Sequence, residues 1–503
     1  MDRRSIIVAA LALIAGTIVS AHSTPAPGRS PTEEQQPDQR LFDPRRPPDR
    51  ELELSIGDGF TLAAVGDCII SRPLSALLKT DAGFAGAARI VREAEVAFGN
   101  LETPIVDLRS FKGSPQGGWD DWPVSAEPGV AADLKALGFD LLARANNHAL
   151  DWGVEGMRET SRLLDEAGLV HAGVGESRAE ARGARYLETE RGRVALVSMA
   201  STYRELSNAL PPYGQAPGRP GVNAVRWKRT TLVTESMMRA LRDLKGAIDA
   251  GSESCSAKPA RPVPAAPPVP APPLELTLFD QNFRVGERPA YHYDVDPQDL
   301  AENLKAIRQG KQHSDFLIAT IHAHENEIDC ERPGDFLPPL AHAAIDAGAD
   351  IFLLHGPHTL GPIEIYKGRL VFYGLGDFFF SDIQEPISAD LYEQSRDLLK
   401  EALGDPARAT DADLNALLNA GYFNDAIFFQ SVIAVSRYDE RRLSEVRLYP
   451  VDLGYGTILT RSGVPRLASP SVGRTILDRL QRLSRPYGTT IAIEKGVGVI
   501  RPH

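Results

Sequence analysis

The feature that most constrains this chain is a repeated pattern in which a short apolar stretch ends in polar residues able to bind a metal ion. Residues 351–354 are the clearest case, since this run is typical of a buried strand and stops at His355, Gly356, Pro357 and His358. Gly and Pro between the two histidines favour a turn over a helix, so both imidazoles can converge on one point. Taken alone, the pair fits surface loop histidines better.

Four further stretches end in the same way. They are 60–65 before Asp67, 96–98 before Asn100 and Glu102, 141–145 before Asn146, Asn147, His148 and Asp151, and 316–321 before His322, His324 and Glu325. In an open α/β sheet, ligands bind outside the carboxyl ends of the strands, so all of these clusters are expected at one edge. The repetition favours a metal or catalytic site over scattered surface residues.

The side chains of these clusters mix carboxylate, amide oxygen and imidazole. This mixture suits Mn²⁺, Zn²⁺ or Fe²⁺ better than an all-oxygen Ca²⁺ site. The candidates are Asp67, Asn100, Glu102, Asn147, His148, His322, His355 and His358. Two ions roughly 3.5 to 4 Å apart would clamp a phosphate and activate a water, which predicts phosphoester hydrolysis. The simpler alternatives are that Asp67 and Asn147 cap helices and that His148 is a core histidine.

The elements between the clusters predict a layered α/β fold. Helical patterns at 85–95, 130–137, 154–167, 297–308 and 340–347 alternate with the strands, which favours a largely parallel sheet. Asp296 is placed to cap the helix that starts at Pro297. Hairpins are expected at 185–199, 363–373 and 428–448, and a final helix at 472–483.

The 503 residues are expected to form one main domain with loop insertions. This domain would span 52–460, interrupted by the Pro/Ala-rich segment 251–275, because candidate ligands lie on both sides of that segment. Residues 461–503 would add a helix and a strand to the same domain. The segments 107–127 and 203–227 are expected to be the loops that determine the substrate.

The first 21 residues have the pattern of an export signal. Arg3 and Arg4 precede an apolar run over 6–19, and Ala21 suits signal-peptidase cleavage. The run is shorter than the roughly 20 residues of a spanning helix, which favours a cleaved signal over an uncleaved anchor. Residues 22–51 are poor in large apolar residues and are expected to form a disordered tether. We therefore expect an exported protein, periplasmic or extracellular, with membrane anchoring as the alternative.

Charge and cysteine content add two further expectations. The net charge is −12 and no long basic stretch occurs, which argues against nucleic acid as a partner. Cys68 is expected to pack as a small buried hydrophobe, and Cys255 with Cys330 is the only plausible disulfide pair.

The polar clusters, taken in order, resemble a known family. The motifs are Gly-Asp, Gly-Asn-Leu-Glu, Asn-Asn-His-x-x-Asp-x-Gly, a strand ending in His, His-Gly-Pro-His and Tyr-x-Leu-Gly-x-Phe, which extend over about 60–382. This set resembles the CapA family of poly-gamma-glutamate and capsule synthesis proteins, within the calcineurin-like metallophosphoesterase superfamily. The resemblance implies a four-layer α/β/β/α sandwich of the metallophosphatase type, with metals at the strand ends.

The resemblance also implies a role for each candidate. The implied metal ligands are Asp67, Asn100, Glu102, Asn147, His322, His355 and His358, and the implied catalytic residues are His148, which would help the leaving oxygen, and Asp151. The chain departs from the family pattern at Ile69, Ala323, Gly356 and Asp377, where Asp377 stands in place of an Asn. The additional His324 and Glu325 are candidates to compensate as ligands.

Two functions from different classes remain open on the sequence. The first is a metal-dependent phosphoesterase or related hydrolase with two ions, acting on a phosphoester or an anionic polymer in capsule or poly-gamma-glutamate-type biosynthesis. The second is a non-catalytic envelope component that binds or exports such a polymer. In both cases, association with a membrane-bound polymer synthesis complex is a possible partnership. The retained ligand-type residues favour the enzyme, and the family's role in capsule synthesis favours the binding protein.

Overall fold

The computed structural model describes residues 52–116, 123–251, 275–327, 331–421 and 424–502. The expected signal peptide and tether, most of the Pro/Ala-rich insertion, and both Cys255 and Cys330 lie outside these ranges. All of the described residues belong to one compact unit.

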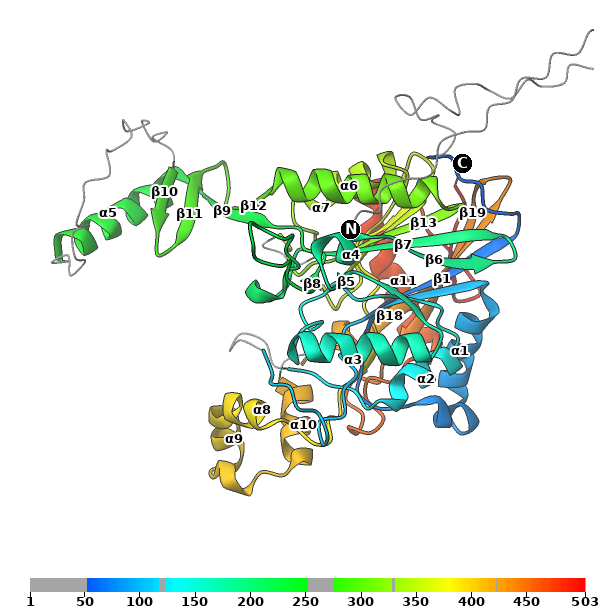
Figure 1. The fold of residues 1–503 in the computed structure, drawn as a ribbon, viewed down its shortest axis with the longest axis horizontal. Helices are drawn as coiled ribbons and strands as arrows, with labels where there is room; N and C mark the ends of the chain where they lie inside the picture. The colour runs from blue at the N-terminus through cyan, green and yellow to red at the C-terminus, as the bar shows by residue number, and fades with distance from the viewer. Residues whose placement is uncertain (1–51, 117–122, 252–274, 328–330, 422–423, 503) are drawn as a thin grey trace, which may run out of the picture. The chain divides into compact units, whose positions relative to one another are not determined.

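The first of two large sheets has 10 strands and carries the N-terminal candidates (Figure 1). Its strands are β1 (Phe60–Ile70), β2 (Val96–Leu101), β3 (Leu141–Ala143), β4 (Val170–Ala172), β17 (Asp377–Ser381), β18 (Gln430–Asp439), β19 (Arg442–Asp452), β20 (Arg466–Leu467), β21 (Ala492–Glu494) and β22 (Val497–Ile500). The order is β21-β22-β19-β18-β1-β2-β3-β4, with β17 also paired to β1. The strands β1 to β4 and β17 are parallel, so their carboxyl ends share one edge.

The second large sheet has 6 strands and carries the C-terminal candidates. Its strands are β6 (Arg185–Thr189), β7 (Gly192–Ala200), β13 (Phe316–His322), β14 (Ile351–His355), β15 (Ile363–Tyr366) and β16 (Arg369–Phe372), in the order β15-β16-β14-β13-β7-β6. The central strands β7, β13, β14 and β16 are parallel. The expected hairpins β6–β7, β15–β16 and β18–β19 are antiparallel pairs, as predicted.

The two sheets pack face to face and helices cover their outer faces. Phe60 and Phe316 meet between the sheets with ring centroids 5.1 Å apart. The helices α1 (Ala82–Glu93), α2 (Gly129–Ala136) and α3 (Gly153–Glu166) pack on the first sheet, and α6 (Pro297–Gln312) and α7 (Leu337–Asp346) on the second. The predicted α/β/β/α sandwich is therefore confirmed.

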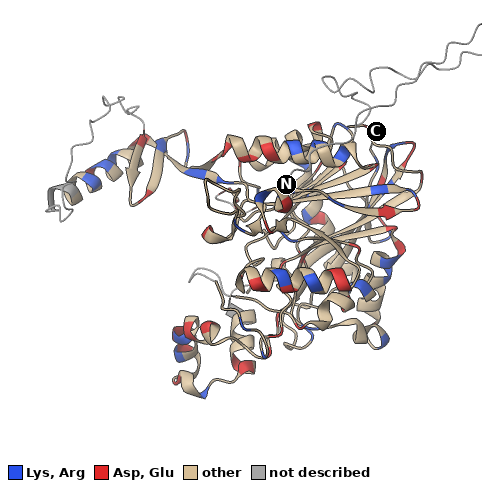
Figure 2. Cartoon of the chain, in the orientation of Figure 1, with Lys and Arg blue, Asp and Glu red and all other residues tan. Residues whose placement is uncertain are grey.

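This layering explains why the strands are continuous apolar runs. In β13, Phe316 and Ile318 face the core between the sheets, whereas Leu317, Ala319 and Ile321 face α6 and α7. Alternate side chains thus point to two different apolar environments, as in any sheet covered on both faces. The outward sides of α3 and α6 carry acidic and basic residues together, so these helices face water (Figure 2).

The helix caps at the start of α6 and α11 are the next feature, and the predicted cap of α6 is confirmed. The Asp296 side chain accepts hydrogen bonds from the backbone N–H groups of Gln298 at 3.0 Å and Asp299 at 2.9 Å, and Pro297 occupies the first turn of α6. The final helix, α11 (Pro470–Ser484), begins at the Ser469 cap. Its residues Ile476, Leu477 and Leu480 join the core between the sheets.

Several elements have no counterpart in the sequence-based prediction. They are α4 (Arg178–Arg182), α5 (Glu235–Gly251), α8 (Ala389–Gln394), α9 (Arg396–Leu403), α10 (Asp411–Gly421), the pair β5 (Val174–Gly175) and β8 (Gly221–Val222), and a four-stranded sheet of β9 (Trp227–Val233), β10 (Glu275–Leu278), β11 (Gln281–Val285) and β12 (Ala290–Val295). Short 3-10 helices cover Ser75–Lys79, Glu205–Ser207, Pro406–Arg408, Ala426–Phe429 and Arg485–Tyr487. None of the described helices has both the length and the apolar character needed to cross a membrane.

Acid should destabilise the fold through His171, which lies in β4. Burial lowers the pKa of this imidazole to about 3, and the nearby Arg144 and Arg185 add to the shift. Asp165 lies 3.3 Å from its Nε2 but is largely exposed and offsets little of this effect. Between about pH 6.5 and 3 the unfolded chain therefore binds more protons, so stability falls as the pH falls, by at most about 1.4 kcal/mol per unit from this group.

We expect the free energy of unfolding of His171→Gln to fall less steeply than that of the wild type as the pH is lowered. The measurement is the free energy of unfolding by urea at intervals between pH 7 and pH 4. His313→Gln, a substitution at the C-cap of α6, is the control and should follow the wild-type curve. An H171Q curve as steep as that of the wild type would contradict the assignment.

Candidate metal centre

The strand ends of both sheets converge on Asp67. In the first sheet, Asp67 of β1 is in register with Asn100 of β2 and with Asp377 of β17. In the second sheet, His322 at the end of β13 is in register with His355 at the end of β14. All five side chains are buried. The structure therefore brings residues from distant parts of the sequence to one polar cluster.

Two glycines allow the strands to approach closely beside Asp67. A Cβ on Gly66 would lie 1.8 Å from the carbonyl oxygen of Gly376, and Gly376 itself has a φ of +72°. No other residue type tolerates both conditions without displacement of the backbone. This contact places β17, and therefore Asp377, next to β1.

The Asp67 carboxylate makes contacts with both sheets. Its Oδ1 accepts a hydrogen bond from Asn100 Nδ2 at 2.8 Å, and its Oδ2 accepts one from the backbone N–H of Gly356 at 2.9 Å. The Nδ1 atoms of His355 and His358 lie 3.8 and 3.9 Å from its oxygens. The alternative that Asp67 caps a helix is wrong, because Asp81 caps α1.

The histidines pack against one another around the same point. His322 Nδ1 lies 3.1 Å from His355 Nδ1, and His322 Nε2 lies 3.0 Å from His324 Nε2. Glu102 Oε1 is 3.5 Å from His322 Nε2 and 3.9 Å from His358 Nε2. Imidazoles at these separations present several ring nitrogens to a shared small volume.

Burial determines the charge state of these rings. It lowers the pKa of His322 well below its ordinary value and lowers the pKa of His355 to about 4. Both rings are therefore neutral near pH 7, and neutral imidazole is the form that binds a metal. Burial also raises the pKa of Asp377 to about 6.

The donor atoms form three overlapping sets that could each hold a metal ion. The sets are Asp67 with His322 and His355, Glu102 with His322 and His324, and Asp67 with His358 and Asp377, and within each set the donor atoms lie within 4.8 Å of one another. Two buried atoms, His355 Nε2 and Asp377 Oδ2, have no hydrogen-bond partner within the described part of the chain. This mixture of nitrogen and oxygen donors fits a divalent transition metal. A bound ion would also give the two buried atoms a partner.

Asn100, Asn146 and Asn147 form the polar wall beside these sets. Asn146 Nδ2 donates to Asn100 Oδ1 at 3.2 Å and to the Leu101 carbonyl at 2.8 Å. Asn147 is buried, and the alternative that it caps a helix is wrong, because Trp152 occupies the N-cap of α3. The amide of Asn146 therefore orients Asn100, whose other end contacts Asp67.

The two residues predicted to be catalytic are hydrogen bonded to each other. His148 Nδ1 lies 2.8 Å from Asp151 Oδ2, and both residues are buried. Arg204 Nε donates to Asp151 Oδ1 at 2.9 Å, and the backbone N–H of Val124 donates to Oδ2 at 2.8 Å. Asp151 thus receives donors from both segments that were expected to be loops, and it fixes the ring of His148.

The structure adds Asp377 to the candidate set, places the predicted candidate His324 in one of the donor sets, and separates Glu325 from them. His358 has a φ of +54°, and its Nδ1 lies 2.8 Å from Asp377 Oδ1. The sequence treated Asp377 only as a departure from the family pattern, although its place directly after Gly376 in a tight turn was a usable signal. Glu325 faces away, where Ser201 Oγ and Thr202 Oγ1 donate to it at 2.5 and 2.7 Å.

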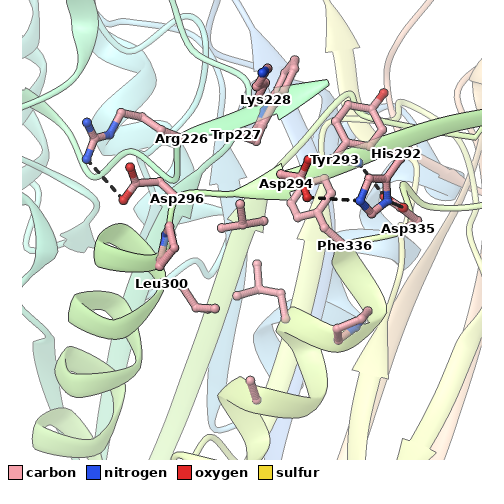
Figure 3. Close-up of a pocket in the computed structure, with 15 residues that line it drawn as sticks. Arg226, Trp227, Lys228, His292, Tyr293, Asp294, Asp296, Leu300, Asp335 and Phe336 are labelled. Atoms are coloured by element: carbon pink, nitrogen blue, oxygen red, sulfur yellow. Dashed lines mark hydrogen bonds and ion pairs between the residues drawn. The ribbon is translucent and has the colours of Figure 1, made fainter. Parts of the chain in front are cut away.

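A separate hollow lies on the far side of Glu325 and contains none of the candidates. It has a volume of about 710 Å³ and is lined by Trp227, Tyr293 and Phe336 among others (Figure 3). Trp227 Nε1 donates to Glu325 Oε1 at 3.1 Å. The aromatic wall of this hollow therefore supports the loop after β13 without contributing to the metal centre.

Asp377→Ala should weaken metal binding by roughly 10- to 100-fold, because the carboxylate both orients His358 and belongs to one donor set. Asp377→Asn keeps the hydrogen bond to the ring and should cost less. The dissociation constant is measured by competition with a chromophoric chelator at pH 7.5. Asp346→Ala, on the exposed end of α7, is the control. An affinity unchanged in D377A would remove Asp377 from the centre.

Comparison with known proteins agrees with this geometry. The bacterial capsule synthesis protein PGA_cap family matches residues 61–382. An uncharacterized protein of Sinorhizobium fredii, y4sH, is 46% identical over 461 residues, which cover 89% of this chain and 94% of the relative.

More distant relatives carry functional names. The PGA biosynthesis protein CapA of Bacillus subtilis is 24% identical, with 64% of each chain covered. A probable polyglutamine synthesis accessory protein of Mycobacterium tuberculosis is 27% identical, with 56% of this chain and 55% of the relative covered. The chain therefore belongs to the CapA family of bacterial capsule synthesis proteins.

Proposed function

We propose that this protein is a metal-dependent hydrolase, most simply a phosphoesterase, that acts in the synthesis of a capsule or poly-gamma-glutamate-type polymer. The observation that carries the proposal is the overlap of the donor sets at Asp67 and His322, next to the hydrogen-bonded pair of His148 and Asp151. A purely structural role leaves the burial of so many histidines and carboxylates at one strand edge without a compensating benefit.

The residues that would hold the metal are Asp67, Glu102, His322, His324, His355, His358 and Asp377, with Asn100 and Asn147 as amide candidates. When bound, a divalent ion supplies Lewis-acid polarisation of a phosphoryl oxygen and a lowered pKa for a water ligand. The number of ions, two in the proposal, and their identity as Mn, Zn or Fe are part of what is tested.

The chain itself supplies proton transfer. Asp151 accepts from Nδ1 of His148, so it holds the imidazole in one orientation and stabilises its protonated form. Nε2 is then the atom that gives a proton to the leaving oxygen of the substrate. Arg204 Nη2 lies 2.8 Å from Asp151 Oδ1, so this buried carboxylate has a cationic partner besides His148.

The proposed role in polymer synthesis is based on the names of the relatives. The Bacillus subtilis relative is named for PGA biosynthesis, and we extend that setting to this chain as an anionic polymer or a phosphoester of its synthesis. We further propose that the export signal at 1–21 operates and that the mature protein works outside the cytoplasm beside a membrane-bound synthesis complex. Fractionation of cells and N-terminal sequencing of the exported product test this part.

A non-catalytic role is the second candidate. The observation in its favour is that the Mycobacterium tuberculosis relative is named an accessory protein. In that case the same centre would bind the polymer or stabilise the fold.

His148→Ala should abolish hydrolysis and leave the metal bound, whereas His355→Ala should lose both. The reason is that a proton donor contributes roughly 10² to 10⁴ in rate without holding the ion, and an imidazole ligand contributes directly to affinity. The measurements are metal content by elemental analysis after dialysis and the rate on bis-p-nitrophenyl phosphate with Mn²⁺ added.

His342→Ala is the matched control, since His342 stacks on Tyr366 outside the cluster. It should behave as the wild type in both measurements. A wild-type protein that binds metal and hydrolyses nothing would favour the accessory role, and one that binds no metal would overturn the proposal.

A further inference from the structure

A hollow of about 690 Å³ borders the loop that carries His358. Pro357 and Thr359, the two neighbours of His358, line it, and so does Asn326, which follows the His324–Glu325 stretch. The opposite wall consists of Phe428 in front of β18 and Arg479 on α11. A ligand in this hollow therefore lies directly against the metal-centre loop.

Arg479 has an unusual environment for an arginine. Its Nε and Nη1 atoms are buried, and no described residue accepts a hydrogen bond from them or forms an ion pair with them. Burial lowers the pKa of this guanidinium, and the nearby charges of Glu331 and Asp425 offset only part of that effect. An arginine in this state costs stability unless something else supplies the missing acceptor.

The acidic residues near Arg479 are committed to other donors. Glu331 forms a two-point contact with Arg482, both distances being 2.8 Å. Asp478 accepts from Arg474 at 2.8 and 2.9 Å, and Asp425 accepts from the backbone N–H of Ile427 at 3.0 Å. Glu331 and Asp478 are thus paired with other arginines, and the described residues leave the Arg479 guanidinium without a carboxylate partner.

We propose that Arg479 forms a subsite for an oxyanion, carboxylate or phosphate, of the ligand whose reactive group reaches the metal centre. The proposal rests on the proposed function, because it assigns to that substrate a second negative charge away from the reacting bond. The planar guanidinium presents paired donors that match either oxyanion.

The volume and the lining of the hollow indicate the size and the polarity of the rest of the ligand. Its volume lies in the range of small-molecule sites, roughly 300 to 1,000 Å³, and exceeds the space that a lone phosphate fills. Pro357, Ile427 and Phe428 give it an apolar wall beside the charged end. The expected ligand therefore carries a carboxylate or phosphate on a body larger than a lone phosphate ion.

The test is direct binding to the metal-loaded full chain. Two probes distinguish the sources of the oxyanion, a five-residue oligo-gamma-glutamate with carboxylates and pentapolyphosphate with phosphates. Arg479→Gln should weaken binding of the recognised probe by roughly 10-fold or more, and Arg479→Lys should fall between, because it keeps the charge and loses the paired donors. Arg474→Gln, on the same helix but paired with Asp478, should change binding less than about two-fold.

The outcomes separate this proposal from the enzyme assignment. If the subsite exists, R479Q loses affinity for the probe while its rate on bis-p-nitrophenyl phosphate, which has no second charge, stays near the wild-type rate. Equal binding of the probes by R479Q and wild type, or no binding of either probe by wild type, overturns the subsite whatever the hydrolysis result. Absence of hydrolysis with R479-dependent binding overturns the enzyme alone. Circular dichroism and melting temperature establish that each variant is folded.

Discussion

The carboxylate of Asp67 is the interaction on which the arrangement of the site depends. One oxygen binds Asn100 of the first sheet and the other binds the backbone of Gly356, which follows the last strand end of the second sheet. Because β1 and β14 belong to different sheets, this single side chain sets how the two edges face each other at the site. Every histidine of the cluster is then placed relative to Asp67, and the apolar core between the sheets holds the frame rigid.

The same frame also explains why the His148–Asp151 pair is separated from the residues that could hold a metal ion. His148 and Asp151 follow β3, two strands away from β1, and are tied to segments that cover the strand ends. The buried imidazoles His322 and His355 are kept neutral by desolvation, whereas His148 is hydrogen bonded to Asp151. The histidines at this edge therefore lie in two different environments, one that favours neutral imidazole through burial and one that provides a carboxylate partner.

The hollow beside Arg479 borders the same site, because it is lined by both neighbours of His358. The family comparison covers 61–382, whereas Arg479 belongs to α11, which follows the β18–β19 hairpin and β20. The C-terminal segment thus brings a cation to the loop that carries His358, so residues outside the matched region take part in the surroundings of the site.

The sequence by itself determined the strands that carry the candidates and most of the cluster, while the order of the layers was implied by the family resemblance. Apolar runs that end in Asp67, Asn100, His322 and His355 are local signals, and parallel pairing obliges their ends to share an edge. The orientation of Glu325, the isolation of Arg479 and the contact that brings Asp377 beside Asp67 were decided by the tertiary structure. Each depends on a contact between distant segments, such as Gly66 against Gly376, that leaves no periodic trace in the chain. The helices α8 to α10 and the small sheet β9 to β12 were missed for a related reason, since short elements are stabilised by packing more than by propensity.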